Sequence, residues 1–580
     1  MFSHFLRKLG TLVTRPDPKA VREGGRVWHP LPAALDMLPL LPTLLTHPSA
    51  VVVKQNHQRT ILRFDMPGGA VFVKRTRANT PRAWAREILR PPKARLEFEN
   101  AVRLRELGIP CAEPLAWAEA DSVWPGESVI VTREVAGAVP LDEFLTDSLV
   151  SAKRRALATE LGRLFARTHA AGVAHPDPHP GNLLVRWDDG PRFVLLDVHA
   201  VRFGPPLTWE GARANLVLFN RWFQLRATRT DRRRFWSAYA AGRAGGVSPL
   251  GLESTRGLTP PARLESDTAA SNRRFWAARD DRYFGTNRQF RKVKAKGIRG
   301  HVVRELPDEL VRSWLADPDA VFTRPGVKLL KDSPSATVGM VPLSPGGEGL
   351  GVRGTGQTIP LTPNPFPPGE RGTILFKRFR LKRAPDALKN LLRRSEALRS
   401  WAFGHGLIDR HLPTARPLFV AHRYRNGIPR EGYVAFEVVP DAVELPEFVS
   451  TASFAELRDL CASLGRLVRT LHDRGVSHRD LKPPNLLLSG PDRTPVFIDL
   501  VGLAVHTDVP DRTRQRDLTR LNAGFVNSPR VTRTLRLRLL LAYLRAWPGL
   551  SVDWKVWWRA IAAGTAKKVL KNLHAGRPLA

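Results

Sequence analysis

The sequence predicts an α+β fold built as two tandem domains, each with a small β-rich lobe followed by a larger helical lobe. At 580 residues the chain is longer than one hydrophobic core normally organises, so two domains are expected. A set of motifs also occurs twice in the same order. Within each repeat, short apolar strand-like runs come first, and segments with apolar residues at helical spacing follow.

The repeat is defined by residues that recur at a nearly constant offset. VFVK at 71–74 returns as ILFK at 374–377, an offset of 303. The same offset relates Glu134 to Glu437, Gly162 to Gly465, His175 to His478, Asp177 to Asp480 and Asn182 to Asn485, and an offset of 302 relates Asp197 to Asp499 and Asn220 to Asn522. These matches predict an N-terminal tail over 1–23, a first domain over 24–300 and a second over 301–580.

The early part of each repeat contains one insertion and one predicted helix. Lys54 and Thr60 match Lys331 and Thr337 at an offset of only 277, so the second copy carries 26 extra residues before ILFK. The Pro- and Gly-rich stretch PLSPGGEGLGVRGTGQTIPLTPNPFPPGERG supplies them, which predicts a disordered insertion over about 342–372. An Arg-rich helix is expected over 82–107.

The chain is strongly basic, with 91 Lys and Arg against 54 Asp and Glu and a net charge of +37. Nucleic acid, anionic phospholipid or a phosphorylated glycolipid would each be attracted, and charge does not choose among them. The clusters at 229–235, 288–299 and 533–545 are contact candidates, although such clusters are more often solvated helix faces.

Targeting signals and cysteine pairs are not evident. Cys111 and Cys461 form no CxxC pair, which argues against a disulfide framework or structural zinc and favours a cytoplasmic compartment. The apolar stretch 31–53 is interrupted by prolines, so no transmembrane helix is expected. Residues 2–13 could form an amphipathic helix, either docked on the protein or lying on a membrane surface.

Two catalytic-loop patterns carry the chemistry. AHPDPHPGNLLV with FVLLDVHA, and SHRDLKPPNLLL with VFIDLVG, closely match the kinase pattern in which Asp and Asn lie five residues apart and a further Asp follows. Phosphoryl transfer needs a carboxylate aimed at the acceptor hydroxyl and separate oxygen ligands for Mg²⁺ on ATP. We assign Asp177 and Asp480 to the hydroxyl; Asn182, Asp197, Asn485 and Asp499 to the metal; and Lys74, Lys377, Glu134 and Glu437 to nucleotide binding. His175 and His478 are expected to pack and hydrogen-bond within the loops.

Both halves resemble the lipopolysaccharide core kinase (Kdo/WaaP-like) family, a branch of the protein-kinase-like superfamily. RLEFENAVRLRELGIPCAEPLAWAE and RSWAFGHGLIDRHLPTARPLFVAH carry the likeness, which covers roughly residues 50–240 and 325–545. The resemblance implies two bilobal kinase-like domains, ATP and Mg²⁺ as cofactors, and a lipopolysaccharide core sugar or other glycolipid as acceptor. It also implies a cytoplasmic protein peripheral to the inner face of an anionic membrane, with nucleic acid not expected as a partner.

The resemblance places Glu97 as the helix glutamate that pairs with Lys74. Glu99 competes for this role, but residues i and i+2 do not share a helix face. In the second copy the corresponding residue is Ser400, and Glu396, one turn earlier, is a candidate substitute. Neither copy has a GxGxxG loop, so less glycine-rich segments would cover the phosphates.

Three functional classes remain open. A sugar or glycolipid kinase is favoured because no Ala-Pro-Glu segment follows either Asp197 or Asp499, and Pro176 precedes Asp177. A Ser/Thr protein kinase is the first alternative, since the second copy has Arg479 and Lys482. A non-catalytic basic scaffold that binds membrane or nucleic acid is the second. We expect the first copy to be active and leave the second open.

Overall fold

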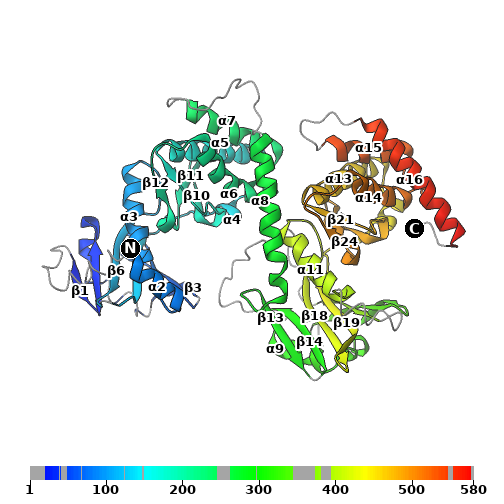
Figure 1. Ribbon diagram of the computed structural model, residues 1–580, viewed down its shortest axis with the longest axis horizontal. Helices are drawn as coiled ribbons and strands as arrows, with labels where there is room; N and C mark the ends of the chain where they lie inside the picture. Colours follow the sequence, from blue (N-terminus) through cyan, green and yellow to red (C-terminus); the bar gives the residue numbers. More distant parts are fainter. Residues whose placement is uncertain are drawn as a thin grey trace. The chain divides into compact units, whose positions relative to one another are not determined.

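The computed structural model describes residues 20–244, 262–343, 373–380, 394–545 and 553–576, with short gaps between 38 and 48 and at 56, 67, 123, 147–148 and 296. It forms two compact units that divide between Ser271 and Asn272. Within each unit, a seven-stranded sheet lies at one end and most of the helices lie at the other (Figure 1). The α+β class and the two-lobed architecture predicted for each copy are confirmed.

The first unit is built on an antiparallel sheet of order β1-β2-β6-β7-β5-β4-β3. Side chains of β4 alternate between buried and half-buried, as expected for a sheet with one face on a core. The strands are β1 (Val21–Glu23), β2 (Arg26–Pro30), β3 (Val51–Gln55), β4 (Arg59–Phe64), β5 (Val71–Arg77), β6 (Pro114–Ala120) and β7 (Glu127–Arg133).

The second unit repeats this topology in the order β13-β14-β18-β19-β17-β16-β15. The strands are β13 (Phe290–Ala295), β14 (Ile298–Val303), β15 (Lys328–Asp332), β16 (Ala336–Pro342), β17 (Thr373–Phe379), β18 (Pro417–Arg425) and β19 (Ile428–Glu437). Because β14 pairs with β18, residues 290–303 belong to the second sheet. The second unit therefore begins before residue 301, where the sequence matches had placed the boundary.

The predicted tail over 1–23 is too long by one strand. Val21–Glu23 forms β1, which pairs with β2 through a two-residue turn at Gly24 and Gly25. Both glycines have positive φ, 60° and 70°, which a turn of this length requires. The predicted surface helix over 2–13 lies outside the described residues, as does the predicted insertion apart from residues 342 and 343.

The single helix expected over 82–107 is two helices, because Pro91 and Pro92 interrupt the chain between them. In the first unit the helices are α2 (Pro81–Leu89), α3 (Lys93–Glu106), α4 (Leu141–Phe144), α5 (Ser151–Ala170), α6 (Trp209–Arg226) and α7 (Arg229–Ala244), and α8 (Ala262–Asp280) contains the division between the units. In the second they are α9 (Asp308–Ala316), α11 (Glu396–Asp409), α12 (Leu445–Thr451), α13 (Phe454–Asp473), α14 (Asp511–Ala523), α15 (Arg533–Arg545) and α16 (Trp554–His574).

Short strands precede and follow the loop that carries the predicted catalytic residues in each unit. A three-stranded sheet and a two-stranded ribbon occur in each helical lobe. Their strands are β8 (Val139–Pro140), β9 (Val173–Ala174), β10 (Leu183–Trp187), β11 (Pro191–Leu195) and β12 (Arg202–Phe203), then β20 (Val443–Glu444), β21 (Val476–His478), β22 (Leu486–Ser489), β23 (Thr494–Phe497) and β24 (Leu503–Val505).

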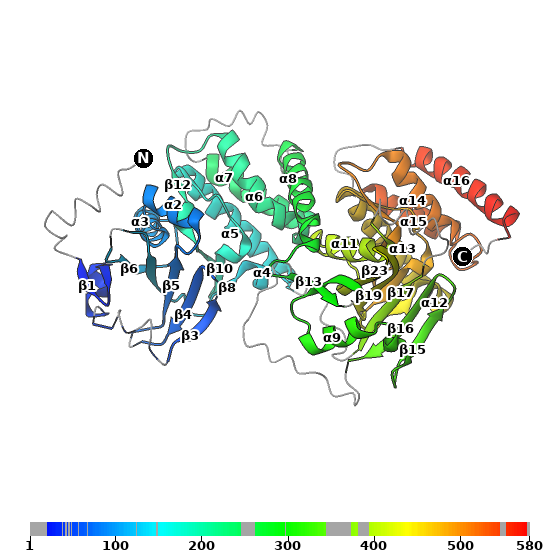
Figure 2. The ribbon, with the colours of Figure 1, turned by 60° about the horizontal axis from the view of Figure 1, so that its bottom comes forward.

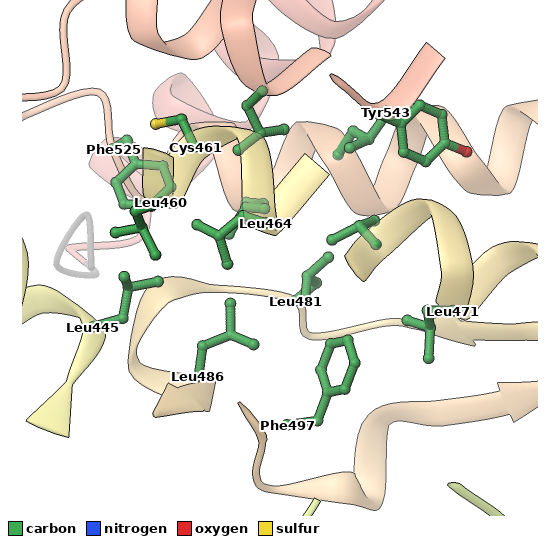
Figure 3. Close-up of a cluster of buried hydrophobic side chains, with 14 of the residues drawn as sticks. Leu445, Leu460, Cys461, Leu464, Leu471, Leu481, Leu486, Phe497, Phe525 and Tyr543 are labelled. Atoms are coloured by element: carbon green, nitrogen blue, oxygen red, sulfur yellow. The ribbon is translucent and has the colours of Figure 1, made fainter. Parts of the chain in front are cut away.

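The helical lobes share a buried scaffold. Leucines of α13 pack with Leu481, Leu486 and Phe497 beneath the loop of the second copy (Figure 3). The repeated glycines allow close helix contact, since a Cβ at Gly162 or Gly465 would lie 2.3 Å from a backbone oxygen of α7 or α15. Both cysteines are buried and free. Within the described residues, every helix is too short or too polar to cross a bilayer.

Candidate active site

The first copy brings a lysine of the sheet against a glutamate of the neighbouring helix. Lys74 lies on β5, and Glu97 lies one turn into α3. Lys74 Nζ donates to both carboxylate oxygens of Glu97, at 2.9 and 2.6 Å. Glu99 faces elsewhere and pairs with Arg95 at 2.7 Å. The structure therefore selects Glu97 over Glu99 as the partner of Lys74.

Asp197 completes this ion cluster from the helical lobe. Lys74 Nζ also donates to Asp197 Oδ1 at 2.8 Å. Arg59 and His199 approach the same carboxylate, at 3.3 and 2.9 Å. Burial alone would raise the pKa of Asp197, but the hydrogen bond from His199 and the charges of Lys74 and Arg59 outweigh it and hold the pKa well below its usual range.

Asp197 has a left-handed backbone, with φ 55° and ψ 43°. Asp499 has nearly the same conformation, with φ 54° and ψ 61°. Among residues other than glycine, Asp and Asn adopt this region most readily. The conformation ends β11 or β23 and starts a short 3₁₀ turn, so both copies present the carboxylate from the same local structure.

The loop between β9 and β10 holds Asp177 and Asn182. Asp177 is exposed, and its backbone N–H donates to Nδ1 of the buried His175 at 3.1 Å. His175 Nε2 in turn donates to the carbonyl of Leu196, beside Asp197. Burial lowers the pKa of His175, so the ring stays neutral and its two hydrogen bonds connect the loop to the residue before Asp197. This matches the packing role expected for it.

Asn182 and Asp197 offer the kind of ligands that Mg²⁺ prefers. Asn182 Nδ2 donates to the backbone oxygen of Asp177 at 3.1 Å, which fixes the amide so that Oδ1 is its acceptor end. Amide and carboxylate oxygens are hard donors suited to magnesium. Glu97, Asp197 and His199 also lie close enough to share one cation, but Lys74 Nζ already contacts both carboxylates there.

Glu134 and Glu437 each accept hydrogen bonds from an arginine. Glu134 directly follows β7, the strand that pairs with β5. Glu437 is the last residue of β19, the strand that pairs with β17. Arg63 donates to both oxygens of Glu134 at 2.9 Å, and these hydrogen bonds lower the pKa of Glu134. Arg416 donates to Glu437 at 3.2 Å. Arg63 and Arg416 therefore engage these two carboxylates.

The second copy keeps the lysine–aspartate contact without the glutamate. Lys377 Nζ lies 3.1 Å from Asp499 Oδ1. Ser400 has the position of Glu97 on α11, where it is buried and donates to the carbonyl of Glu396 at 2.9 Å. Glu396 is exposed at the first residue of α11, and no contact with Lys377 is found within the described residues.

The loop of the second copy has a different arrangement of charge. Lys482 Nζ lies 3.2 Å from Asp480 Oδ2. Asn485 Nδ2 donates to the backbone oxygen of Asp480 at 2.8 Å and to its carboxylate at 3.2 Å. In the first copy His179 occupies the position of Lys482, and its Nδ1 accepts from Gly181 N–H. The two loops therefore share a backbone arrangement, but only the second has a lysine beside its aspartate.

Three residues of the first site were missed from the sequence. Arg59 and His199 contact Asp197, and the half-buried Lys93 lies one turn before Glu97. Burial and the nearby charges of Arg86 and Arg59 lower the pKa of Lys93, which places it in the same cationic region. The available signals were an arginine in the glycine-poor segment 54–60 and a histidine two residues after Asp197. The second copy has Ala336, Val501 and Glu396 at these positions.

The fold and the arrangement of lysine, catalytic-loop and metal-type residues define the protein-kinase-like class, present here in two tandem copies. The family model described as "Lipopolysaccharide kinase (Kdo/WaaP) family" matches residues 48–239 and 377–543. These two regions make up more than half of the chain, which therefore belongs to this family of kinases. The resemblance inferred from the sequence motifs is confirmed.

The structural comparison finds a solved structure titled "WaaP in complex with acyl carrier protein". It is 25% identical, covers 37% of this chain and 86% of its own, and has a TM-score of 0.28. No curated protein matches the chain significantly.

Proposed function

We propose that the first copy transfers the γ-phosphoryl group of ATP to a hydroxyl of a lipopolysaccharide core sugar or related glycolipid. The observation that carries this is the cluster of Lys74, Glu97 and Asp197, in which both lobes fix one lysine. A lysine held in this way is suited to neutralising nucleotide phosphates. The family supports kinase chemistry, and its name suggests the acceptor class.

Each residue has a distinct role in this proposal. Asp177 would orient the acceptor hydroxyl and take its proton as the hydroxyl oxygen bonds to the γ-phosphorus and the bond to the departing ADP oxygen breaks. His175 would keep the loop in place. Asn182 and Asp197 would hold Mg²⁺, which when bound neutralises charge on the phosphates. Glu97 would keep Lys74 in position rather than touch the nucleotide.

A glycolipid acceptor would be met at the surface of a membrane, so the proposal includes peripheral association of the protein with the cytoplasmic face. Electrostatic attraction supports this, because the net charge of +37 favours contact with anionic headgroups.

The second copy gives one reason to retain another acceptor. Lys482 lies beside Asp480, as the HRDLKPPN motif implies for a Ser/Thr kinase. Transfer to a protein hydroxyl is therefore the second candidate function. The missing glutamate partner of Lys377 argues that this copy is the weaker catalyst.

Magnesium-dependent ATP turnover tests these proposals in four proteins: the wild type, Asp177→Ala, Asp480→Ala and the double variant. Lipopolysaccharide core material and a generic protein are offered separately. We expect turnover to require the core material and to fall by roughly 10²-fold or more in Asp177→Ala, with a smaller effect of Asp480→Ala. Preferential labelling of protein would favour the second candidate. Equal inactivity of four folded proteins would leave the scaffold hypothesis.

A further inference from the structure

The last described helix, α16, is anchored to the second unit along one face only. Trp557, Ile561 and Thr565 are its buried residues. Thr565 Oγ1 accepts a hydrogen bond from Asn522 Nδ2 at 2.9 Å and donates to the carbonyl of Ile561 at 2.7 Å. In both views the C-terminal turns of α16 extend past the neighbouring helices of this unit (Figures 1 and 2).

The opposite face of α16 exposes large apolar side chains. Val556, Leu570 and Leu573 are 54%, 56% and 58% exposed. At about 100° per residue, Leu570 points directly away from the buried Ile561. The exposed Ala563 and Ala566 lie on the same side, while Arg559 lies on it between Val556 and Ala563. An apolar strip therefore covers the C-terminal half of the outer face, from Ala563 to Leu573.

Positive charge borders this strip. The 21 residues of α16 include Lys555, Arg559, Lys567, Lys568 and Lys571 but no Asp or Glu. Lys567 and Lys571 follow one edge of the strip at the spacing of one turn. The combination of exposed leucines with charged side chains that are all lysine or arginine is typical of helices that lie in a membrane interface.

The helix that matches α16, α8, has the corresponding position covered by the second compact unit. In α8, Thr268 Oγ1 accepts a hydrogen bond from Asn220 Nδ2 and donates to the carbonyl of Leu264. Thr565 makes the same two hydrogen bonds in α16. This match places Trp276 at the position of Leu573. Trp276 is only 3% exposed and donates from Nε1 to the carbonyl of Asp409. Leu573 has no such cover in the described part of the chain.

We propose that the outer face of α16 docks on the surface of an anionic lipid bilayer. At 1.5 Å per residue the outer face is about 30 Å long, with the apolar strip over its C-terminal half, which suits a flat, extended target. Leucines would enter the headgroup region while lysines contact lipid phosphates. The inference assigns an element to the membrane association included in the proposed function, and it does not require that either copy be catalytic.

Sedimentation of the full chain with vesicles tests this docking surface. Phosphatidylcholine vesicles with and without phosphatidylglycerol are compared at low and high salt. The variant Leu570→Glu is matched with Phe454→Glu, which places the same charge at a residue of α13 that is 61% exposed. Both sites are exposed, so circular dichroism should show unchanged folding. A second variant, Lys567→Gln with Lys571→Gln, tests the electrostatic part.

We expect salt-sensitive binding that requires phosphatidylglycerol. Leu570→Glu should weaken it by roughly tenfold or more, and the double lysine variant by roughly tenfold to thirtyfold, while Phe454→Glu binds as the wild type does. Unchanged binding by Leu570→Glu, or no binding by the wild type, would overturn the proposal. So would a dimer that Leu570→Glu dissociates, because a second copy would then be the occupant. ATP turnover in solution is measured separately, so loss of docking and loss of catalysis are distinguishable.

Discussion

The lysines of the two copies differ in how many groups hold them. Lys74 contacts Glu97 from α3 and Asp197 from the helical lobe, and its side chain is 13% exposed. Lys377 is 18% exposed and contacts only Asp499 among these groups, and Asp499 is 45% exposed against 25% for Asp197. A charge fixed by two partners in a partly buried setting loses little freedom on meeting a phosphate. The first site is therefore organised before nucleotide arrives, and the second is less so.

The ion pair leads to a prediction with a matched control on the same helix. We expect Glu97→Gln to lower ATP turnover by roughly 10²-fold, because Lys74 loses its helix partner and shifts from its position. Glu99→Gln, which removes only the exposed pair with Arg95, should leave turnover unchanged. Steady-state turnover with saturating acceptor checks both. Equal effects of the two changes would show that Lys74 does not depend on Glu97.

Local spacing could predict part of this site and could not predict the rest. Asp177 and Asn182 are recognisable because a single loop fixes both. Arg59 reaches Asp197 across 138 residues, and nothing local distinguishes it from the many surface arginines. Arg59 starts β4, which pairs with β5, and Lys74 of β5 contacts the same Asp197. The pairing of these two strands therefore brings Arg59 to Asp197. Glu134 and Glu437 recur at the offset of the repeat, and the spacing alone did not predict that Arg63 and Arg416 would be their partners.

At the scale of elements, the repeated glycines explain how the long helices approach one another. Gly162 on α5 faces Phe235, Ala238 and Tyr239 of α7, and Gly465 on α13 faces the equivalent residues of α15. His169 and His472 each bond a tyrosine of the same facing helix, Tyr239 and Tyr543, at 2.9 Å. Close contact and a buried hydrogen bond therefore fix this helix pair twice in the chain.

Gly162→Ala should destabilise the first unit by about 1–3 kcal/mol, because its Cβ would lie 2.3 Å from the carbonyl of Phe235 and α7 would have to move. Thermal unfolding followed by circular dichroism would detect this as a drop of several degrees. Gly190→Ala is the control, since a Cβ there meets nothing within 4 Å. An unchanged midpoint for Gly162→Ala would mean that the helices are not in close contact.

Element type was easier to predict than element limits. Apolar periodicity identified the strands and helices of both lobes, but Pro91 and Pro92 divide a stretch whose pattern looked continuous. The sequence matches predict a boundary at 300/301, which leaves residues 290–300 in the first domain. Their place is decided by pairing of β14 with β18, more than a hundred residues later in the chain, and such long-range pairing leaves no local signal.

For the whole molecule, buried histidines couple stability to pH in both units. Burial lowers the pKa of His169, His301 and His422 from 6.5 to about 4. Between these values the unfolded chain binds more protons than the folded one. The contribution of these neutral rings to the free energy of unfolding is therefore fully present above about pH 6.5 and is lost as pH is lowered toward 4. The loss is up to about 3 kcal/mol for a fully buried ring such as His169.

Thermal midpoints measured from neutral pH down to about pH 4.5 should decline in the wild type. His169→Gln should decline less steeply in the transition of the first unit, because one buried titrating ring has been removed. His574→Gln, which changes an exposed ring on α16, should follow the wild type. A parallel decline in wild type and His169→Gln would assign the pH dependence to other groups.

The left-handed backbone at Asp197 and Asp499 bears on how the two halves of a duplicated gene can diverge. Most substitutions at such a position carry a conformational penalty of about 1–2 kcal/mol, whatever the residue does chemically. Selection for folding alone would thus keep aspartate, or replace it with asparagine or glycine. An aspartate at this position can therefore be retained after a copy has lost its activity. Glu97 lies on a helix of ordinary conformation, where no such penalty opposes substitution, and the matching residue of the second copy is Ser400.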